Sequence, residues 1–357
     1  MKTIQSLYTL MAGAALVLCS CSADADQAQA PAAGAVELRL GSTVAADATT
    51  RGYDADNLLS GDTCYVWADM VNSTDGRQTP YFLAWQLEAD GVGGLSPVPV
   101  SNKKLFPATN VLNFYALVGN FGSRTVTDPD TGAESNVPYI TAEEDELPVT
   151  GIKHTVMADQ RAAENYYKSD LLYAVRKGQA PVSQAVVLPF KHMLSRVQVV
   201  LVAANGLRPA DLLNSTEGTT VTLLNLKQQV TFKPDSAQSF DDRTKLSAML
   251  STPAGVVTGD ITMATQVVAD AASATESAAY ADAIVVPQTV QANQRLIRVD
   301  YLGRTAYYTL PSDFVFKSGS QYRFRILVDR VGTSYQLQTV NVEEWGANTV
   351  KPLWLEE

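Results

Sequence analysis

Residues 186–199 read VVLPFKHMLSRVQV, and this stretch indicates the fold class. A run of β-branched and apolar residues from Val186 to Phe190 is followed by the Lys191-His192 step and by a second run that begins at Arg196. Short runs of this composition are typical of β-strands. We therefore expect two strands joined at Lys191-His192, with His192 as a packing or hydrogen-bonding residue between them.

The same composition recurs along the chain. Segments rich in β-branched and aromatic residues predict strands at residues 63–68, 81–87, 111–118, 185–190, 196–203, 221–232, 284–286, 295–301, 306–310 and 321–328. Turn sequences such as residues 72–76 separate these segments, and helical signals are few. The chain is therefore predicted to be all-β, built from antiparallel β-sandwiches.

Length and charge set the domain number and limit the partners. A chain of 357 residues predicts two ordinary domains. A long strand ends at Ala203 and the Asn205-Gly206 turn follows, so we place an N-terminal β-sandwich domain at residues 52–205 and a C-terminal one at 206–357. The formal net charge is −10, which argues against a nucleic-acid partner because such proteins need a basic surface.

The N-terminus reads as an export signal. Residues 1–20 carry one positive charge and an apolar stretch too short to span a bilayer comfortably, as in a signal peptide. Ser20 precedes Cys21, an arrangement that resembles the bacterial lipoprotein signal, whose cysteine is acylated and inserts into a membrane. The alternative is an ordinary signal peptide with an incidental cysteine. Once Cys21 is acylated, Cys64 would be the one remaining cysteine, so no intrachain disulfide is expected.

Markers of catalysis and metal binding are missing from the sequence. The two histidines, His154 and His192, lie far apart, and no HExxH, CxxC or Gly-x-Ser-x-Gly motif occurs. Residues 128–139 resemble part of a calcium loop but place Tyr139 where an EF-hand needs glutamate. The acidic run at residues 143–146 is typical of a solvated loop. We expect no enzyme activity, no cofactor and no metal.

Several short motifs resemble the signature of the fimbrillin family, the subunits of type V pili, including the Mfa-like lipoproteins. Besides residues 186–199, the motifs in chain order are Thr50-Arg51, Gly61-Asp62, Phe114-Tyr115-Ala116, residues 170–174, 285–288 and 317–322, and Glu344-Trp345-Gly346. Each is weak alone, and the resemblance rests on their order and spacing over essentially the whole mature chain. It implies two transthyretin-like antiparallel β-sandwiches in tandem.

The resemblance also implies assembly by strand exchange. Such subunits are exported as outer membrane lipoproteins, an arginine-specific protease removes an N-terminal strand, and the vacated groove accepts a strand from another pilus subunit of the cell-surface fimbrium. Here the lipidated, cleavable segment would be residues 21–51, cut between Arg51 and Gly52. The removed plug strand would point Val36, Leu38 and Leu40 inward.

The donated strand should come from the C-terminus. Alternation and apolar content there single out Tyr335, Leu337, Val342, Leu353, Trp354 and Leu355. The alternative is a last strand that packs on its own second domain.

A different class of function stays open at this stage. The chain could be a surface lipoprotein that never polymerises, or a pilus anchor, and could bind a glycan or a host ligand to support adhesion. Exposed aromatic platforms would then be needed, and the candidates are Trp67, Trp85, Tyr166 and Tyr167. A cleavable leader together with an apolar tail favours an internal or tip position in the pilus over its base.

Overall fold

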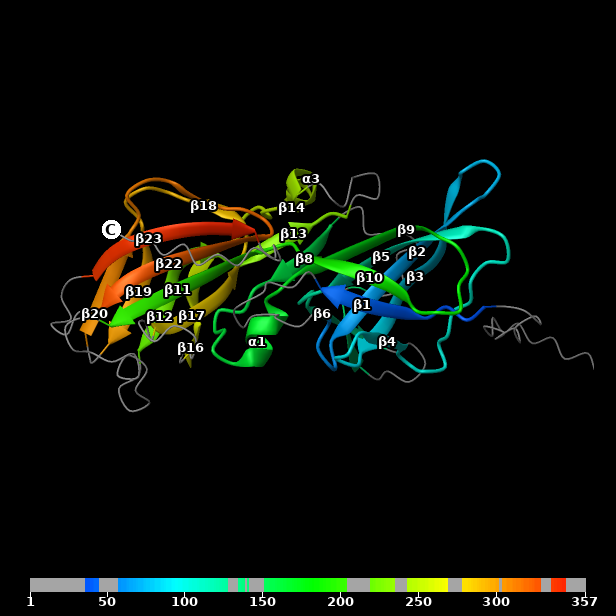
Figure 1. Ribbon diagram of the computed structural model, residues 1–357, viewed down its shortest axis with the longest axis horizontal. Helices are drawn as coiled ribbons and strands as arrows, with labels where there is room; N and C mark the ends of the chain where they lie inside the picture. Colours follow the sequence, from blue (N-terminus) through cyan, green and yellow to red (C-terminus); the bar gives the residue numbers. More distant parts are fainter. Residues whose placement is uncertain are drawn as a thin grey trace, which may run out of the picture. The chain divides into compact units, whose positions relative to one another are not determined.

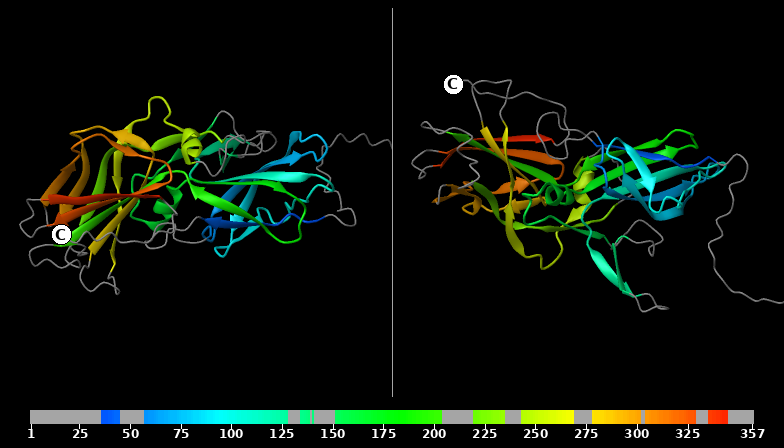
Figure 2. Two further views of the ribbon diagram at one scale, coloured as in Figure 1. Left: turned by 45° about the horizontal axis from the view of Figure 1, so that its top comes forward. Right: turned by 90° about the horizontal axis from the view of Figure 1, so that it is seen from below.

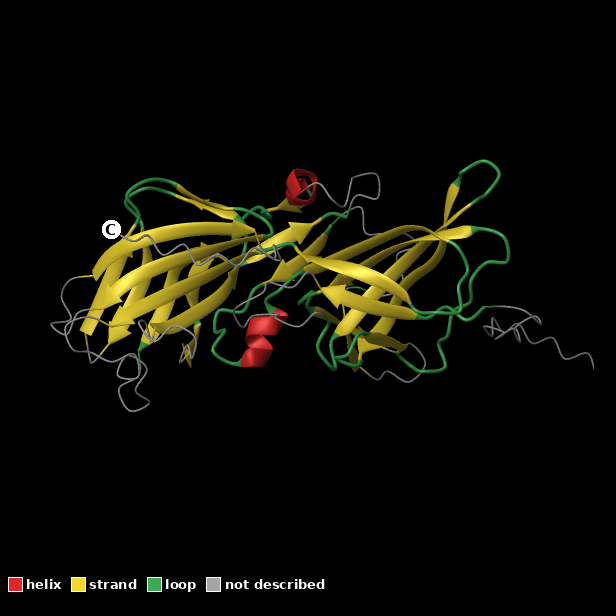
Figure 3. Cartoon of the chain, in the orientation of Figure 1, coloured by secondary structure: helices red, strands yellow, loops and turns green. Residues whose placement is uncertain are grey.

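Strands make up almost all of the regular structure (Figures 1 and 3). The computed structural model describes residues 36–44, 57–127, 134–138, 140, 151–203, 219–234, 243–268, 278–301, 304–328 and 335–344. Within these ranges the helices are α1 (Ala163–Lys168) and α3 (Arg243–Ala248), and neither is long and apolar enough to cross a membrane. The all-β fold class is confirmed, while the tandem transthyretin-like architecture stays a prediction.

Seven strands form a closed barrel in the order β1-β10-β9-β5-β2-β3-β4. Their bounds are β1 (Leu40–Val44), β2 (Thr63–Val71), β3 (Gln78–Ala89), β4 (Gly94–Pro97), β5 (Val111–Val118), β9 (Leu172–Gln179) and β10 (Val186–His192). Closure depends on β1, which runs parallel to β10 and antiparallel to β4. Without β1 the barrel would be an open sheet with two unpaired edges.

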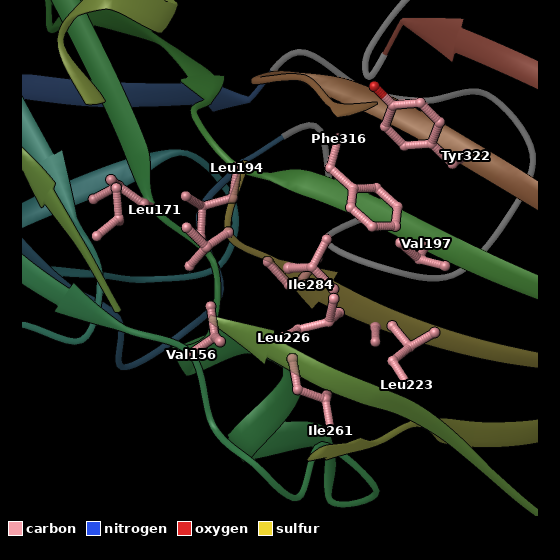
Figure 4. Close-up of a cluster of buried hydrophobic side chains, with 14 of the residues drawn as sticks. Val156, Leu171, Leu194, Val197, Leu223, Leu226, Ile261, Ile284, Phe316 and Tyr322 are labelled. Carbon is pink, nitrogen blue, oxygen red and sulfur yellow. The ribbon is translucent and has the colours of Figure 1, made fainter. Parts of the chain in front are cut away.

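Two further sheets pack face to face. A five-stranded sheet has the order β16-β17-β11-β22-β23, and a four-stranded sheet has the order β15-β12-β19-β20. Their bounds are β11 (Ser195–Ala203), β12 (Thr220–Lys227), β15 (Thr258–Thr262), β16 (Ala264–Val268), β17 (Ala278–Val285), β19 (Arg295–Tyr301), β20 (Arg304–Thr309), β22 (Ser320–Val328) and β23 (Tyr335–Glu344). Val197 and Ile284 from one sheet meet Leu223 and Ile261 from the other in a shared core (Figure 4).

Smaller sheets complete the described structure. They are β14-β13-β8, formed by Leu250–Ser251, Gln229–Phe232 and Ile152–Thr155; β18-β21, formed by Gln288–Val290 and Phe314–Phe316; and β6-β7, formed by Ser123–Thr127 and Glu134–Pro138. The β6-β7 hairpin stands away from the other sheets in the right-hand view of Figure 2. The predicted domain boundary at Asn205-Gly206 lies outside the described residues.

The barrel strands β2 and β5 are buried on both faces. Along β2, Cys64 and Val66 point into the barrel core, whereas Tyr65 and Trp67 join the core shared with the later sheets. Successive strand residues point to opposite faces, so a strand covered on both sides must be apolar throughout. Cys64 is fully buried on β2, and this burial raises the pKa of its thiol.

Candidate functional site

The earliest strand of the described chain, β1, is held on both sides by backbone hydrogen bonds. It pairs with β10 from Leu40 to Val44 and with β4 at Leu40 and Gly41 (Figure 1, β1 in blue). Just upstream, Leu38 N donates to Lys104 O, and Phe106 N donates to Val36 O, both at 2.9 Å. We define the β1 site as β4, β10 and residues 104–106, the segments that bond to residues 36–44.

Side chains of this segment alternate between the barrel core and the solvent. Leu38, Leu40, Ser42 and Val44 are buried, and the three apolar ones join the core formed with Leu95, Phe106, Val186 and Leu188. Arg39 and Thr43 are exposed. The outer positions therefore add little to the fit, and the inner ones supply the apolar contact.

The regular strand lies further along the chain than the alternating run in the sequence indicated. That run ends at Leu40, whereas β1 begins there and continues through Gly41, Ser42 and Thr43. These three residues are small or polar and carry no apolar alternation. The role of Val36, Leu38 and Leu40 as a plug stays a prediction.

Two loops contact β1 at Ser42, its middle residue. Asp90 Oδ1 accepts hydrogen bonds from Val92 N and Gly94 N, both at 2.8 Å, and Gly93 O accepts one from Ser42 N at 2.8 Å. In the other loop, Leu58 N donates to Ser42 Oγ at 3.4 Å.

The carboxyl of Asp62 stabilises the second of these loops. Leu59 N donates to Asp62 Oδ2 at 2.8 Å. Burial, with a smaller contribution from the charge of Asp170, raises the pKa of Asp62 to about 6. The Gly61-Asp62 motif therefore shapes the loop that contacts β1.

Two sequence motifs meet at a buried hydrogen bond between His192 and Asp170. His192 Nδ1 donates to Asp170 Oδ2 at 2.6 Å, and both side chains are buried. The motifs at residues 170–174 and 186–199 meet here because β9 and β10 pair antiparallel, with His192 opposite Leu172. No local spacing in the sequence links His192 to a carboxylate 22 residues earlier, so this partner is visible only in the structure.

A third motif holds the connection between β10 and β11. Ser318 Oγ donates to Met193 O at 2.6 Å, and Gly319 N donates to Leu194 O at 2.8 Å. Ser195 Oγ in turn donates to Lys317 O at 2.8 Å. These motifs therefore bind segments of the chain to one another. The imidazole of His192 is shielded from solvent, so it offers no surface to a substrate.

The sequence profile of the Fimbrillin-like family matches residues 50–345. The chain belongs to the fimbrillin-like family. This membership supports a role as a pilus subunit in a cell-surface fimbrium, in which the protein has a structural part. Among curated proteins, no relative matches the sequence.

Solved structures share the fold of this fimbrillin-like protein. A candidate cell adhesion protein from Bacteroides uniformis aligns with a TM-score of 0.52 at 17% identity, over 88% of this chain and 100% of that one. A candidate cell adhesion protein from Bacteroides ovatus aligns with a TM-score of 0.56 at 14% identity, over 87% and 98%. At this identity the likeness concerns the fold alone.

The remaining predicted site residues of the fimbrillin-like chain fall into two groups. Cys21, Arg51, Gly52, Leu353, Trp354 and Leu355 lie outside the described residues. Tyr335, Leu337 and Val342 lie on β23, an edge strand that pairs antiparallel with β22. The described end of the chain is therefore a strand of its own sheet.

Three of the four aromatic side chains considered as glycan platforms are core residues. Trp67 and Trp85 are each 3% exposed and Tyr166 is 5% exposed. Trp85 Nε1 donates to Asn102 O at 2.8 Å, and Tyr167 is partly buried. The platform interpretation is wrong for Trp67, Trp85 and Tyr166, because the strands β2 and β3 and the helix α1 turn these side chains into the core.

Proposed function

We propose that this fimbrillin-like protein is exported as an outer membrane lipoprotein through Cys21 and assembles by protease-triggered strand exchange at the β1 site. One observation carries the proposal: β1 closes the barrel, and only residues 45–56, which include Arg51, join it to the rest of the barrel. A cut between Arg51 and Gly52 would leave β1 bound by non-covalent contacts alone.

The energetics favour a closed precursor. Leu38, Leu40 and Val44 each contribute roughly 1.5–3 kcal/mol of gross burial energy. A strand from another subunit would gain a comparable amount, but the chain's own strand has an effective concentration in the millimolar range. The attached strand therefore occupies the β1 site until the linker is cut. Cleavage, rather than a difference in affinity, starts the exchange.

The same cut would release the subunit from its lipid. Cys21 and β1 both lie upstream of Arg51, so the acylated end and the plug strand leave together. The freed subunit can then join a fimbrium through a C-terminal segment of another subunit, for which Tyr335, Leu337, Val342, Leu353, Trp354 and Leu355 are the proposed donor residues.

The test compares two arginine variants treated with an arginine-specific protease. Arg77 is exposed and serves as the matched control for Arg51. Wild-type protein and Arg77→Ala should lose residues upstream of Gly52, as mass spectrometry reports, and should form ladders on non-denaturing gels. Arg51→Ala should remain a folded monomer, and ladders from it would refute the proposal. Cut protein that never polymerises would favour a non-polymerising surface lipoprotein or an anchor.

A further inference from the structure

The closed barrel has two ends, and the pairing directions of its strands decide which segments meet at each. At one end, here called the tether end, β1, β3, β5 and β10 begin and β2, β4 and β9 finish. Residues 36–39, which lead into β1, lie there with the connections 72–77, 98–110 and 180–185. Figure 1 shows the β2-β3 turn and the connection before β5 at this end, on the right.

The tether end is basic in a chain that is acidic overall. Residues 36–39, 69–78, 98–110 and 176–186 carry six basic and three acidic side chains, a formal net charge of +3, whereas the whole chain carries −10. The basic ones are Arg39, Arg77, Lys103, Lys104, Arg176 and Lys177, and the acidic ones are Glu37, Asp69 and Asp75. All the basic side chains except the partly buried Lys104 are exposed. Since salt screens charges beyond about 8 Å, this local excess governs what the tether end attracts.

An apolar side chain projects from the same end. Val100 is 70% exposed in the connection that follows β4. The backbone of this connection is held in place, because Trp85 Nε1 donates to Asn102 O at 2.8 Å and Asn102 N donates to Pro99 O at 2.9 Å. Val100 and the exposed Lys103 therefore project from a fixed loop. Basic residues beside an exposed apolar one suit contact with anionic lipid headgroups.

The segment that carries the proposed lipid enters at the tether end. Leu38 N donates to Lys104 O and Phe106 N donates to Val36 O, so the first described residues are bound to the connection after β4. Val36 lies 15 positions after Cys21, a length of chain that spans about 50 Å at most. An acylated Cys21 would therefore hold the tether end within reach of a membrane surface.

We propose that the tether end is a membrane-contacting surface, which docks on the anionic headgroups of the membrane that holds the lipid of Cys21. This inference rests on the proposed lipid anchor. Each basic residue close to an anionic surface strengthens binding by roughly fivefold, so a few of them bind only weakly by themselves. The anchor supplies proximity, and the basic residues decide which end of the barrel meets the membrane.

Docking by the tether end would keep the cleavage linker away from the membrane. Val44, the last residue of β1, pairs with Phe190 near the end of β10, at the opposite end of the barrel. Asn57 lies at that end too, because a Cβ on Gly93 in the β3-β4 turn would meet its Oδ1 at 2.9 Å. Both ends of the linker that contains Arg51 therefore face away from the proposed contact. A protease in solution could reach the linker while the precursor stands on the membrane.

Vesicle binding of an unlipidated chain tests the surface. The mature chain with Cys21→Ser is sedimented with phosphatidylcholine vesicles that either contain phosphatidylglycerol or lack it. Binding should be about tenfold stronger on the anionic vesicles and should weaken as salt is added. The double variant Arg77→Glu/Lys103→Glu should lose this preference, since two exposed positive charges of the tether end become negative. An unchanged melting midpoint shows that the variant is folded.

The matched control changes the net charge equally at another place. Lys168→Glu/Lys245→Glu reverses two exposed charges on α1 and α3, outside the barrel. It should keep the preference for anionic vesicles within about twofold. Equal losses in the two double variants would show that net charge alone governs binding, and equal binding of the parent chain to both kinds of vesicle would show no headgroup contact. Either result would refute the proposal.

An anchored chain tests the orientation. Cys21 of the mature chain is coupled to a maleimide lipid, a reaction that buried Cys64 does not compete for. On anionic vesicles, trypsin should cut at Arg77 about fivefold more slowly than on neutral ones and at Arg51 equally fast on both. Equal rates at Arg77 would overturn the docking. A failure to cut at Arg51, or protein from cells without acyl chains on Cys21, would instead overturn the proposed function, because the vesicle assay uses neither.

Discussion

At the scale of single residues, a buried histidine and a half-buried aspartate oppose each other in their effect on stability. Burial lowers the pKa of His154 from 6.5 to about 4, and burial raises the pKa of Asp62 from 3.8 to about 6. As the pH rises from 4 to 6.5, His154 increasingly favours the folded state, because only the unfolded chain binds its proton there. Asp62 acts in the opposite sense between pH 3.8 and 6, since only the folded chain keeps its proton.

Removing the Asp62 titration should expose the effect of His154. In Asp62→Asn the free energy of unfolding should rise more steeply from pH 4 to pH 7 than in the wild type, by up to about 2 kcal/mol after allowance for solvent access. Urea titrations at several pH values measure this. Asp75→Asn is the control, because exposed Asp75 also accepts a backbone hydrogen bond, from Arg77 N at 2.9 Å. Parallel profiles for Asp62→Asn and the wild type would contradict the assignment.

Residue roles were predictable only where the cause is local. The placement of Cys64 inside a strand follows from its apolar neighbours. The partner of His192 does not, because Asp170 reaches it through the pairing of β9 with β10. Likewise, alternation gave no sign that Trp67 is covered, since its cover comes from the later sheets.

At the scale of elements, β1 differs from the other barrel strands because its extended conformation depends largely on its partner strands. Its second half, Gly41-Ser42-Thr43, has little strand signal of its own. It is extended because β10 and β4 offer unpaired backbone groups on either side. The sequence therefore predicted a strand here but placed it too early, since partner strands do not show in a local pattern.

The hold of the barrel on β1 should depend on its inward side chains. Leu40→Ala should destabilise the closed barrel by about 2–4 kcal/mol, through lost burial and the cavity left behind. In chain cut at Arg51, the β1 peptide should then dissociate faster than from the wild type, as native mass spectrometry over time would show. Thr43→Ala removes an exposed side chain and should leave the rate unchanged. Equal release from both variants would mean that the backbone pairing alone holds β1.

At the scale of the whole molecule, polar contacts between distant segments join the elements. Gln160 is buried, and its side-chain amide both donates to Ile284 O and accepts from Ile284 N, each at 2.8 Å. Residues 152–155 of β8 pair with residues 229–232 of β13. Chain length and strand number predicted the amount of structure, but they could not show contacts between residues 124 positions apart.

These contacts predict one cooperative unfolding transition for the intact chain. Separate sandwiches with a loose connection would melt independently, whereas a buried bridge makes each part lose stability when the other opens. Differential scanning calorimetry should give a single peak whose calorimetric and van't Hoff enthalpies agree.

Gln160→Ala leaves the Ile284 backbone groups without these hydrogen bonds and should cost about 2–4 kcal/mol, lowering the midpoint. Exposed Gln294→Ala should leave the midpoint in place. Two resolved peaks in the wild type would show that the bridge at Gln160 does not couple the parts it connects.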